Sequence, residues 1–251
     1  MTHCNDIIIC EPRTYRSLED IDGFTSFRVV VETSDLFIMA LKNLSDQARN
    51  STVECRAQIE DAIRRRPEFL KSYKPLKPDE MDSPVVLRMI NASRKAGVGP
   101  MASVAGAVAE FVGRNLLRLS DEVIVENGGD VFIHVKRGIT VGVFAGTSLF
   151  AGKIGIRIGP TSVPVSVCTS SAKVGPSTSL GRVDAATVVS FDSSLADAVA
   201  TGLGNRVMKN SDLKPAVSWA TNIDGVLGAL AIMEDKMAIS GDIELTPINE
   251  T

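Results

Sequence analysis

Two residues four positions apart offer hard oxygen ligands of the kind that Mg²⁺ prefers. Asp197 and Thr201 lie in the segment SLADAVATGL, which indicates a short helix, and residues at this spacing share one helical face. The spacing therefore allows the carboxylate and the hydroxyl to bind one metal ion together. The alternative is that Asp197 only stabilises the first helical turn through the helix dipole and that Thr201 is an incidental residue.

A second polar cluster interrupts the apolar segment VIVENGGDVFIHV. The run Asn127, Gly128, Gly129 and Asp130 is typical of a tight hairpin turn, because such turns need positive φ values. The two glycines would also let backbone amides approach an anionic ligand, with Glu126 as a further polar group beside the gap. A turn alone accounts for the pattern, and a ligand-binding edge is the more specific interpretation.

Cys168 ends a predicted strand and is followed by Thr169, Ser170 and Ser171. We expect this strand end to face the same pocket, where a thiolate could carry sulfur or flavin. The alternative is a small buried strand residue, since buried cysteine behaves as a compact hydrophobe. His134 is expected to be a hydrogen-bonded structural histidine, because the sequence gives it no catalytic partner.

The elements that must position these residues begin with two predicted strands, at residues 6–10 and 27–33, which we expect to open the fold as an antiparallel pair. From Ser34 the spacing of Phe37, Leu41 and Leu44 predicts a helix with Ser34 as its N-cap, interrupted near residues 50–52. Prolines then require this helix to stop near Arg66. A second helix is expected over residues 84–96, before Gly97.

The segment GVGPMASVAGAVAEFVGRNLL carries small residues at helical spacing, which permit either tight helix packing or the close approach of a ligand. From Glu122 onward, short β-rich runs predict a meander of strands. A short helix capped by Ser194, another near residues 213–220 and a closing hairpin at residues 242–245 are expected to follow. The order of elements predicts an α+β fold with mainly antiparallel sheets and packed helices.

Composition restricts the classes of function. The 251 residues and 44% apolar content suit one domain over residues 1–251, with lobes of approximately 1–120 and 121–251. A net charge of -3 argues against a nucleic-acid partner. No apolar stretch approaches the roughly 20 residues that span a bilayer, so we expect a cytoplasmic protein without a membrane partner. Four scattered cysteines and two histidines give little support for a zinc site.

Taken together, the segments GPMASVAGAVAE, ENGGD, CTSS (residues 168–171) and ADAVATG resemble the successive motifs of ApbE-like flavin transferases, in the same order and over most of the chain. The likeness is closest to a smaller, poorly characterised cytoplasmic branch that shares PEFL, VGPMASVAGA and the doubled TSS. The resemblance implies a T-fold-like architecture with a ligand cleft between lobes.

The resemblance also implies ligands and residue roles. The ligands would be a flavin (FAD or FMN) or an adenine nucleotide, with Mg²⁺ held by Asp197 and Thr201. In the characterised transferases, FAD is cleaved and FMN is attached to a Ser or Thr of an acceptor protein. The expected ligand-binding residues are Gly99, Met101, Ala102, Asn127, Gly128, Gly129, Asp130, Thr169, Ser170 and Ser171.

One departure concerns the reaction centre. Where the transferases carry a segment resembling HIIDPRTG, this chain reads AKVGPSTSLGRVDAA, with Pro176 in the place of the histidine. The nearby polar candidates are Ser177, Thr178, Ser179 and Asp184, of which Ser177 joins Asp197, Thr201 and Cys168 as a catalytic candidate. Phosphoryl-type transfer relies on positioning and charge stabilisation more than on one base. We therefore expect binding, with transfer as a further hypothesis.

Two alternatives stay open at this stage. One is an accessory protein of sulfur or homocysteine metabolism with Cys168 as a persulfide carrier. The other is a catalytically inactive scaffold whose Gly-rich cleft binds a protein partner. Exposed strand edges also make a homodimer an expectation.

Overall fold

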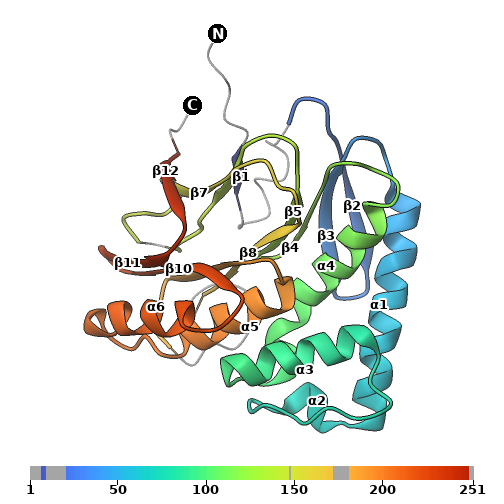
Figure 1. The fold of residues 1–251 in the computed structure, drawn as a ribbon, viewed down its shortest axis with the longest axis horizontal. Helices are drawn as coiled ribbons and strands as arrows, with labels where there is room; N and C mark the ends of the chain where they lie inside the picture. The colour runs from blue at the N-terminus through green and yellow to red at the C-terminus, as the bar shows by residue number, and fades with distance from the viewer. Residues whose placement is uncertain (1–6, 10–20, 147, 172–180, 249–251) are drawn as a thin grey trace.

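The computed structural model describes residues 7–9, 21–146, 148–171 and 181–248. Its elements form three layers, with helices on one face of a large sheet and a smaller sheet on the other (Figure 1). The architecture is α+β with mostly antiparallel strands, as the order of elements predicts.

The large sheet has eight strands in the order β11-β10-β9-β8-β5-β4-β3-β2, and every neighbouring pair in it is antiparallel. Its strands are β2 (Thr25–Val31), β3 (Ser34–Ala40), β4 (Val123–Asn127), β5 (Asp130–His134), β8 (Val165–Ser170), β9 (Ala185–Ser190), β10 (Val226–Met233) and β11 (Lys236–Gly241). The sheet combines strands from both sides of residue 120, so the two ends of the chain share one hydrogen-bonded layer.

The small sheet has four strands in the order β1-β6-β7-β12. They are β1 (Ile7–Ile9), β6 (Ile139–Gly142), β7 (Ile154–Ile158) and β12 (Glu244–Pro247). Between the two sheets lies a core that includes Phe37, Met39 and Ile133 from the large sheet and Val141 and Ile156 from the small one.

The helices cover the other face of the large sheet. They are α1 (Ser45–Arg65), α2 (Glu68–Lys71), α3 (Pro84–Ala96), η2 (Pro100–Ser103), α4 (Val104–Leu116), α5 (Ser193–Gly204), η3 (Asn210–Asp212) and α6 (Leu213–Thr221). Within the described residues, no single helix has the length and hydropathy to cross a bilayer, and one pair bent by 103°, Pro84–Ala96 with Pro100–Leu116, meets that test on length and composition alone.

The helix predicted from Ser34 to about Arg66 is wrong in its first part. Residues 34–40 form strand β3, which lies between β2 and β4 in the large sheet and is buried along its whole length. Leu36 and Ile38 pack toward the helices while Phe37 and Met39 pack toward the small sheet. A strand covered on both faces has no polar alternation, so its apolar run is easily mistaken for the start of a helix.

The rest of that segment forms one continuous helix. Helix α1 begins at Ser45 and passes through residues 50–52 without a break. Thr52 Oγ1 donates to the carbonyl of Ala48 at 2.7 Å, so the polar residues fit inside the helix rather than interrupting it. As predicted, the helix ends beside the first proline of the connector, at Arg65.

Four further expectations are wrong, three about strand connections and one about a helix cap. Strand β1 pairs in parallel with β6 rather than with β2, whose partner is β3. Strands β6 and β7 leave the meander for the small sheet, and β12 pairs with β7 instead of closing a hairpin with β11. The N-cap of α5 is Asp192, whose side chain accepts from the backbone N–H of Leu195 at 2.9 Å, and not Ser194.

Two local predictions are confirmed. Helix α3 begins at Pro84 and stops at Gly97, which adopts φ of 72°, the left-handed conformation that favours glycine. The sequence ENGGD forms the hairpin turn between β4 and β5, with Gly128 at φ of 66°.

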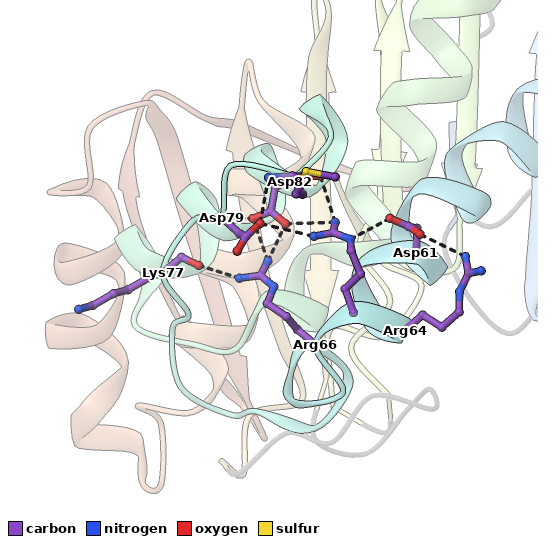
Figure 2. Close-up of polar contacts among 8 residues, drawn as sticks. Asp61, Arg64, Arg66, Lys77, Asp79 and Asp82 are labelled. Carbon is purple, nitrogen blue, oxygen red and sulfur yellow. Dashed lines mark hydrogen bonds and ion pairs between the residues drawn. The ribbon is translucent and has the colours of Figure 1, made fainter.

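The connector between α1 and α3 is held by a cluster of ion pairs that we call the arginine clasp: Arg65, Arg66, Asp79 and Asp82 (Figure 2). Arg66 Nη2 donates to both carboxylate oxygens of Asp82, at 2.7 and 2.8 Å, and the Asp82 side chain has no exposed surface. Charge-assisted bonds to a buried carboxylate are among the stronger hydrogen bonds. The clasp therefore fixes residues 79–82 of the connector against the end of α1.

Candidate functional site

A cavity of about 550 Å³ opens where the helices meet the turn between β4 and β5. Its walls come from several segments between Thr33 and Thr201. The lining residues are Thr33, Ser34, Arg56, Ile59, Glu60, Ile63, Leu70, Met101, Ala102, Val104, Ala105, Val108, Asn127, Gly128, Gly129, Asp130, Phe144, Thr169, Ser170, Ser171, Asp197 and Thr201. The volume lies within the range of ordinary small-molecule sites.

Asp197 stands on the α5 side of the cavity, where α4 approaches closely. The backbone N–H of Gly106 donates to Asp197 Oδ2 at 2.9 Å. A Cβ on Gly106 would lie 2.3 Å from the carbonyl oxygen of Ser193, so this approach requires glycine. Burial raises the pKa of Asp197 to about 7, although the N–H groups of Gly106 and Ala105 act in the opposite direction.

Asp130 stands on the strand side, as the first residue of β5. Burial raises its pKa well above the usual range, the nearby Asp197 and Glu126 carboxylates add to the increase, and a hydrogen bond from Cys168 opposes it. Asp130 Oδ1 is buried and has no hydrogen-bond partner within the described parts of the chain. The cavity thus holds two carboxylates that disfavour each other's charge.

The turn between these strands forms part of the cavity wall. A Cβ on Gly129 would lie 2.5 Å from the carbonyl oxygen of Thr169, and the Thr169 N–H donates to the carbonyl of Gly129 at 2.9 Å. Asn127 Nδ2 donates to the carbonyl of Ala105 at 3.0 Å. The turn therefore needs glycine for contact with the end of β8, and Asn127 joins it to the start of α4.

The N-terminus of α5 is fixed by Glu110, a buried residue of α4. Glu110 Oε2 accepts from the backbone N–H of Ser193 at 2.9 Å, while Oε1 accepts from Arg88 and Arg114, each at 2.6 Å. An acidic group at a helix N-terminus satisfies a free N–H group and complements the helix dipole. This contact, one turn from Asp197, holds α5 in place beside the cavity.

The far end of the cavity is formed by α1 and the turn between β2 and β3. Arg56 Nη1 donates to Thr33 Oγ1 at 3.1 Å and to Ser34 Oγ at 3.0 Å. Its Nη2 binds the carboxylates of Glu32 and Glu60. Arg56 is the one lysine or arginine among the described lining residues, and its charge is already matched. The remaining wall at this end is largely apolar.

Most of the residues singled out by sequence lie together around this cavity. Those on its wall are Met101, Ala102, Asn127, Gly128, Gly129, Asp130, Thr169, Ser170, Ser171, Asp197 and Thr201. Gly99 lies outside the wall and packs on the connector, since a Cβ there would be 1.7 Å from the carbonyl oxygen of Ser72. Ser177, like Pro176, Thr178 and Ser179, lies outside the described residues.

Cys168 and His134 are not among the described residues that line the cavity. The Cys168 side chain has no exposed surface, and its Sγ donates to the carbonyl of Ser193 at 3.6 Å. His134 Nδ1 is 3.1 Å from Thr161 Oγ1, a contact that suits a structural histidine. The role of Cys168 as a sulfur carrier stays a prediction, and it would require β8 and α5 to separate.

Sequence reasoning missed the α1 wall. Ile59, Glu60 and Ile63 line the cavity together with Arg56. The available signal was the repeat of Arg56, Glu60 and Ile63 at intervals of three or four residues, which places them on one face of a helix. The pattern does not say what that face meets, because α1 reaches the cavity only through tertiary packing.

The donor set suits a hard cation. Within the described residues there is no cluster of three or more His, Cys, Asp or Glu side chains with metal-site geometry. Asp130, Asp197 and Thr201 instead offer two carboxylates and a hydroxyl around one cavity. Mg²⁺ is commonly bound by one or two carboxylates together with water and substrate phosphates, so these residues fit Mg²⁺ better than zinc.

Comparison with known proteins agrees with this architecture. A family model described as AbpE bacteria matches residues 16–242. A relative named UPF0280 protein from Methanothrix thermoacetophila is 39% identical over 198 residues, covering 78% of this chain and 83% of the relative. Another, from Archaeoglobus fulgidus, is 34% identical and covers 87% of this chain and 89% of the relative.

Two solved structures share the fold. The apo form of Pseudomonas stutzeri flavinyl transferase ApbE has a TM-score of 0.55 at 11% identity, covering 89% of this chain and 94% of its own. The flavin transferase ApbE from Vibrio cholerae has a TM-score of 0.56 at 12% identity, covering 86% of this chain and 96% of its own. At these identities the similarity concerns the fold, and it confirms the ApbE-like architecture.

Proposed function

The chain belongs to the AbpE bacteria family of ApbE-like proteins, and from this membership we propose that its cavity binds a flavin nucleotide, FAD or FMN, together with Mg²⁺. The observation that carries the proposal is the cavity itself. Two buried carboxylates and a threonine hydroxyl meet apolar walls in a space of about 550 Å³. Solved structures of this fold are named flavin transferases.

In this proposal Asp197 and Thr201 hold the metal ion from one face of α5. Asp197 is oriented by the Gly106 N–H, and α5 is oriented by the contact between Glu110 and Ser193. A bound Mg²⁺ would neutralise phosphate charge beside the two carboxylates. The described wall otherwise offers Arg56 alone as a cation, and its pairing with Glu32 and Glu60 keeps it from phosphate.

The other walls suit the remaining parts of a flavin nucleotide. Val104, Val108 and Ile63 present apolar surface to a ring system, since small-molecule sites combine apolar walls with a few polar groups. The turn at Gly128 and the hydroxyls following β8, at Thr169 and Ser170, supply polar contacts to ribityl or phosphate oxygens. A flavin nucleotide would therefore use both the apolar and the polar parts of the cavity wall.

We propose transfer of FMN to a Ser or Thr of an acceptor protein as the activity that accompanies binding. The acceptor hydroxyl oxygen would form a bond to the phosphorus of the FMN half of FAD while the phosphoanhydride bond to AMP breaks; AMP would leave, and the hydroxyl proton would pass to water. The family likeness supports this step, and its main requirement is positioning of the phosphate. No histidine lines the cavity within the described ranges, so the step relies on carboxylates and hydroxyls.

The test measures equilibrium binding of FAD to the purified 251-residue chain. Flavin fluorescence reports the bound fraction, in the presence of either Mg²⁺ or EDTA. Wild-type protein is expected to bind FAD with Mg²⁺ and to lose affinity at least tenfold in EDTA. Asp197→Ala should behave as wild type in EDTA even when Mg²⁺ is present. The control is Asp235→Asn, which removes an exposed carboxylate in the turn between β10 and β11, and it should bind as wild type.

The proposal fails if wild-type protein shows no affinity for FAD, FMN, ADP or AMP with Mg²⁺. It also fails if Asp197→Ala keeps Mg²⁺-dependent binding, because the metal would then lie elsewhere. An inactive scaffold for a protein partner predicts the first of these results and partner binding that is insensitive to Asp197→Ala.

A further inference from the structure

Asp130 has a buried carboxylate oxygen without a hydrogen-bond partner among the described residues, and a metal ion held by Asp197 and Thr201 alone would not account for it. The residue is 7% exposed and lines the cavity, and its Oδ1 is a buried oxygen without a hydrogen-bond partner among the described residues. A buried acceptor left unsatisfied costs free energy, more so for a carboxylate. Such an atom in a cavity wall points to a ligand that satisfies it.

The groups around Asp130 are negative or neutral and offer its carboxylate no positive charge. Asp197 faces it within the same cavity, and Glu126 lies nearby on β4, so the neighbouring charges are negative. Cys168 supplies a hydrogen bond but no positive charge. Buried charges in proteins are normally paired or coordinate metals, and Arg56, the one described cation on the wall, is bound to two glutamates.

We propose that Asp130 is a third protein ligand of the divalent cation, opposite Asp197 and Thr201. The inference rests on the proposed function, since it extends the metal site from α5 to the turn between β4 and β5. A divalent cation satisfies Oδ1 and offsets the repulsion between Asp130 and Asp197 at once. A ligand hydroxyl would satisfy the oxygen but would leave the two carboxylates facing each other.

The arrangement has a consequence for the order of binding. With three protein oxygens, the cation has a site before any nucleotide arrives. The metal then converts a negatively charged wall into one that accepts phosphate. The protein should therefore bind the cation in the absence of nucleotide, and this property separates the inference from the proposed function.

The experiment titrates Mn²⁺ alone into the full-length chain and measures free Mn²⁺ by electron paramagnetic resonance. Wild-type protein is expected to bind one Mn²⁺, and Asp130→Asn should bind it at least about 10-fold more weakly, because loss of even an outer-shell partner of a metal ligand typically costs about 10- to 100-fold in metal affinity. Asp235→Asn changes the net charge by the same amount away from the cavity and should match wild type. Circular dichroism checks that each variant is folded.

A folded Asp130→Asn protein that binds Mn²⁺ as tightly as wild type overturns the inference, whether or not its FAD affinity falls. The proposed function would still hold in that case if wild type binds FAD with Mg²⁺. Wild-type protein that binds Mn²⁺ only when FAD is present also overturns the inference alone. Wild-type protein that binds neither Mn²⁺ nor FAD overturns both.

A second measurement needs no variant and so does not depend on the folding of Asp130→Asn. Crystals of the wild-type chain grown with Mn²⁺ and without nucleotide should give an anomalous peak about 2.1 Å from Asp130 Oδ1, near the distance at which carboxylates bind such ions. A peak beside Asp197 and Thr201 that is more than about 3 Å from Asp130 would overturn the inference.

Discussion

Asp130 and Asp197 are carboxylates kept in a place where their charge is unfavourable. Burial raises the pKa of Asp197 to about 7, and burial and Asp197 raise that of Asp130 well above its usual range. Strongly shifted groups in a cavity are characteristic of functional sites. The two carboxylates lower the stability of the metal-free protein, as is expected of residues kept for binding rather than for folding.

The raised pKa of Asp197 predicts how stability depends on pH. Since the folded state holds this proton more tightly than the unfolded state does, its contribution to stability is complete below about pH 4 and is lost as pH rises through about 7. The free energy of unfolding of the metal-free protein should therefore fall between pH 5 and pH 8. Chemical denaturation at several pH values, in EDTA, measures the slope.

Asp197→Asn serves as the comparison for this slope and should make it smaller, whatever its effect on absolute stability. Mg²⁺ should stabilise wild-type protein more at pH 8 than at pH 5.5, because metal ligands bind in their deprotonated form. An unchanged slope in Asp197→Asn would show that this carboxyl does not titrate as described.

The sequence predicts which residues form the site better than it predicts how those residues are arranged in space. Spacing alone put Asp197 and Thr201 on one helical face, and Gly128 and Gly129 in a turn. Nothing local says that this turn and α5 meet. The turn and α5 come together because β8 pairs with β5 and packs against α5. Local sequence patterns do not show such a long-range contact, and only the resemblance to a family predicted a shared site.

Among the elements, the contact between α4 and α5 matters most for the site. Gly106 allows the two helices to approach and gives its N–H to Asp197. From the sequence alone, the small residues in this segment indicate either tight helix packing or the close approach of a ligand. The structure shows that one glycine achieves the packing while its neighbour Ala105 lines the cavity.

Gly106→Ala should therefore weaken both the fold and the site. The new Cβ would lie 2.3 Å from the carbonyl oxygen of Ser193, and overpacking of this kind costs about 1–3 kcal/mol. Mg²⁺ affinity should fall because the N–H that orients Asp197 moves. Gly159→Ala is the control, since a Cβ there meets nothing within 4 Å; equal unfolding free energies for the two variants would refute the close-approach argument.

The arginine clasp is the second element-scale feature with a measurable effect. Asp82 has no exposed side-chain surface and binds Arg66 through both oxygens. Asp82→Ala should lower the free energy of unfolding by about 1.5–3 kcal/mol, the range for hydrogen bonds to charged groups. Asp61→Ala removes a carboxylate that pairs with Arg65 but is 51% exposed, so it should change stability little. Urea denaturation compares them, and similar losses would contradict a specific role for the buried pair.

The errors at this scale have a common physical cause. Helices with one exposed face, such as α3, show their period and their ends in the sequence. Strand β3 does not, because it is buried on both faces and continues into α1 after a short loop. The pairing partners of β1 and β12 could not be predicted from local sequence patterns either, because each pairing joins distant parts of the chain.

At the scale of the whole molecule, the cavity is assembled from both halves of the chain. Helix α1 and η2 contribute from before residue 120, and β5, β8 and α5 from after it. The division into lobes at about residue 120 stays a prediction, but the eight-stranded sheet runs across that boundary. A ligand in the cavity therefore contacts elements that must unfold together.

Binding should consequently shift one unfolding transition for the entire chain. With FAD and Mg²⁺ at about 100 times the dissociation constant, stabilisation is roughly 2.7 kcal/mol. For a chain of this size, that corresponds to an increase in Tm of roughly 5–10 °C. Calorimetry should show a single peak that moves as a unit, whereas two peaks of which one moves would contradict a cavity shared by both halves.

A crystal structure of the 251-residue chain grown with FAD and Mg²⁺ would test directly whether the cavity binds a flavin nucleotide through a metal ion. We expect flavin nucleotide density in the cavity between α1, α4 and the turn between β4 and β5, with its phosphates beside a metal ion bound to Asp197 and Thr201. A nucleotide bound elsewhere, or a cavity without nucleotide at FAD concentrations that saturate binding in solution, would contradict it.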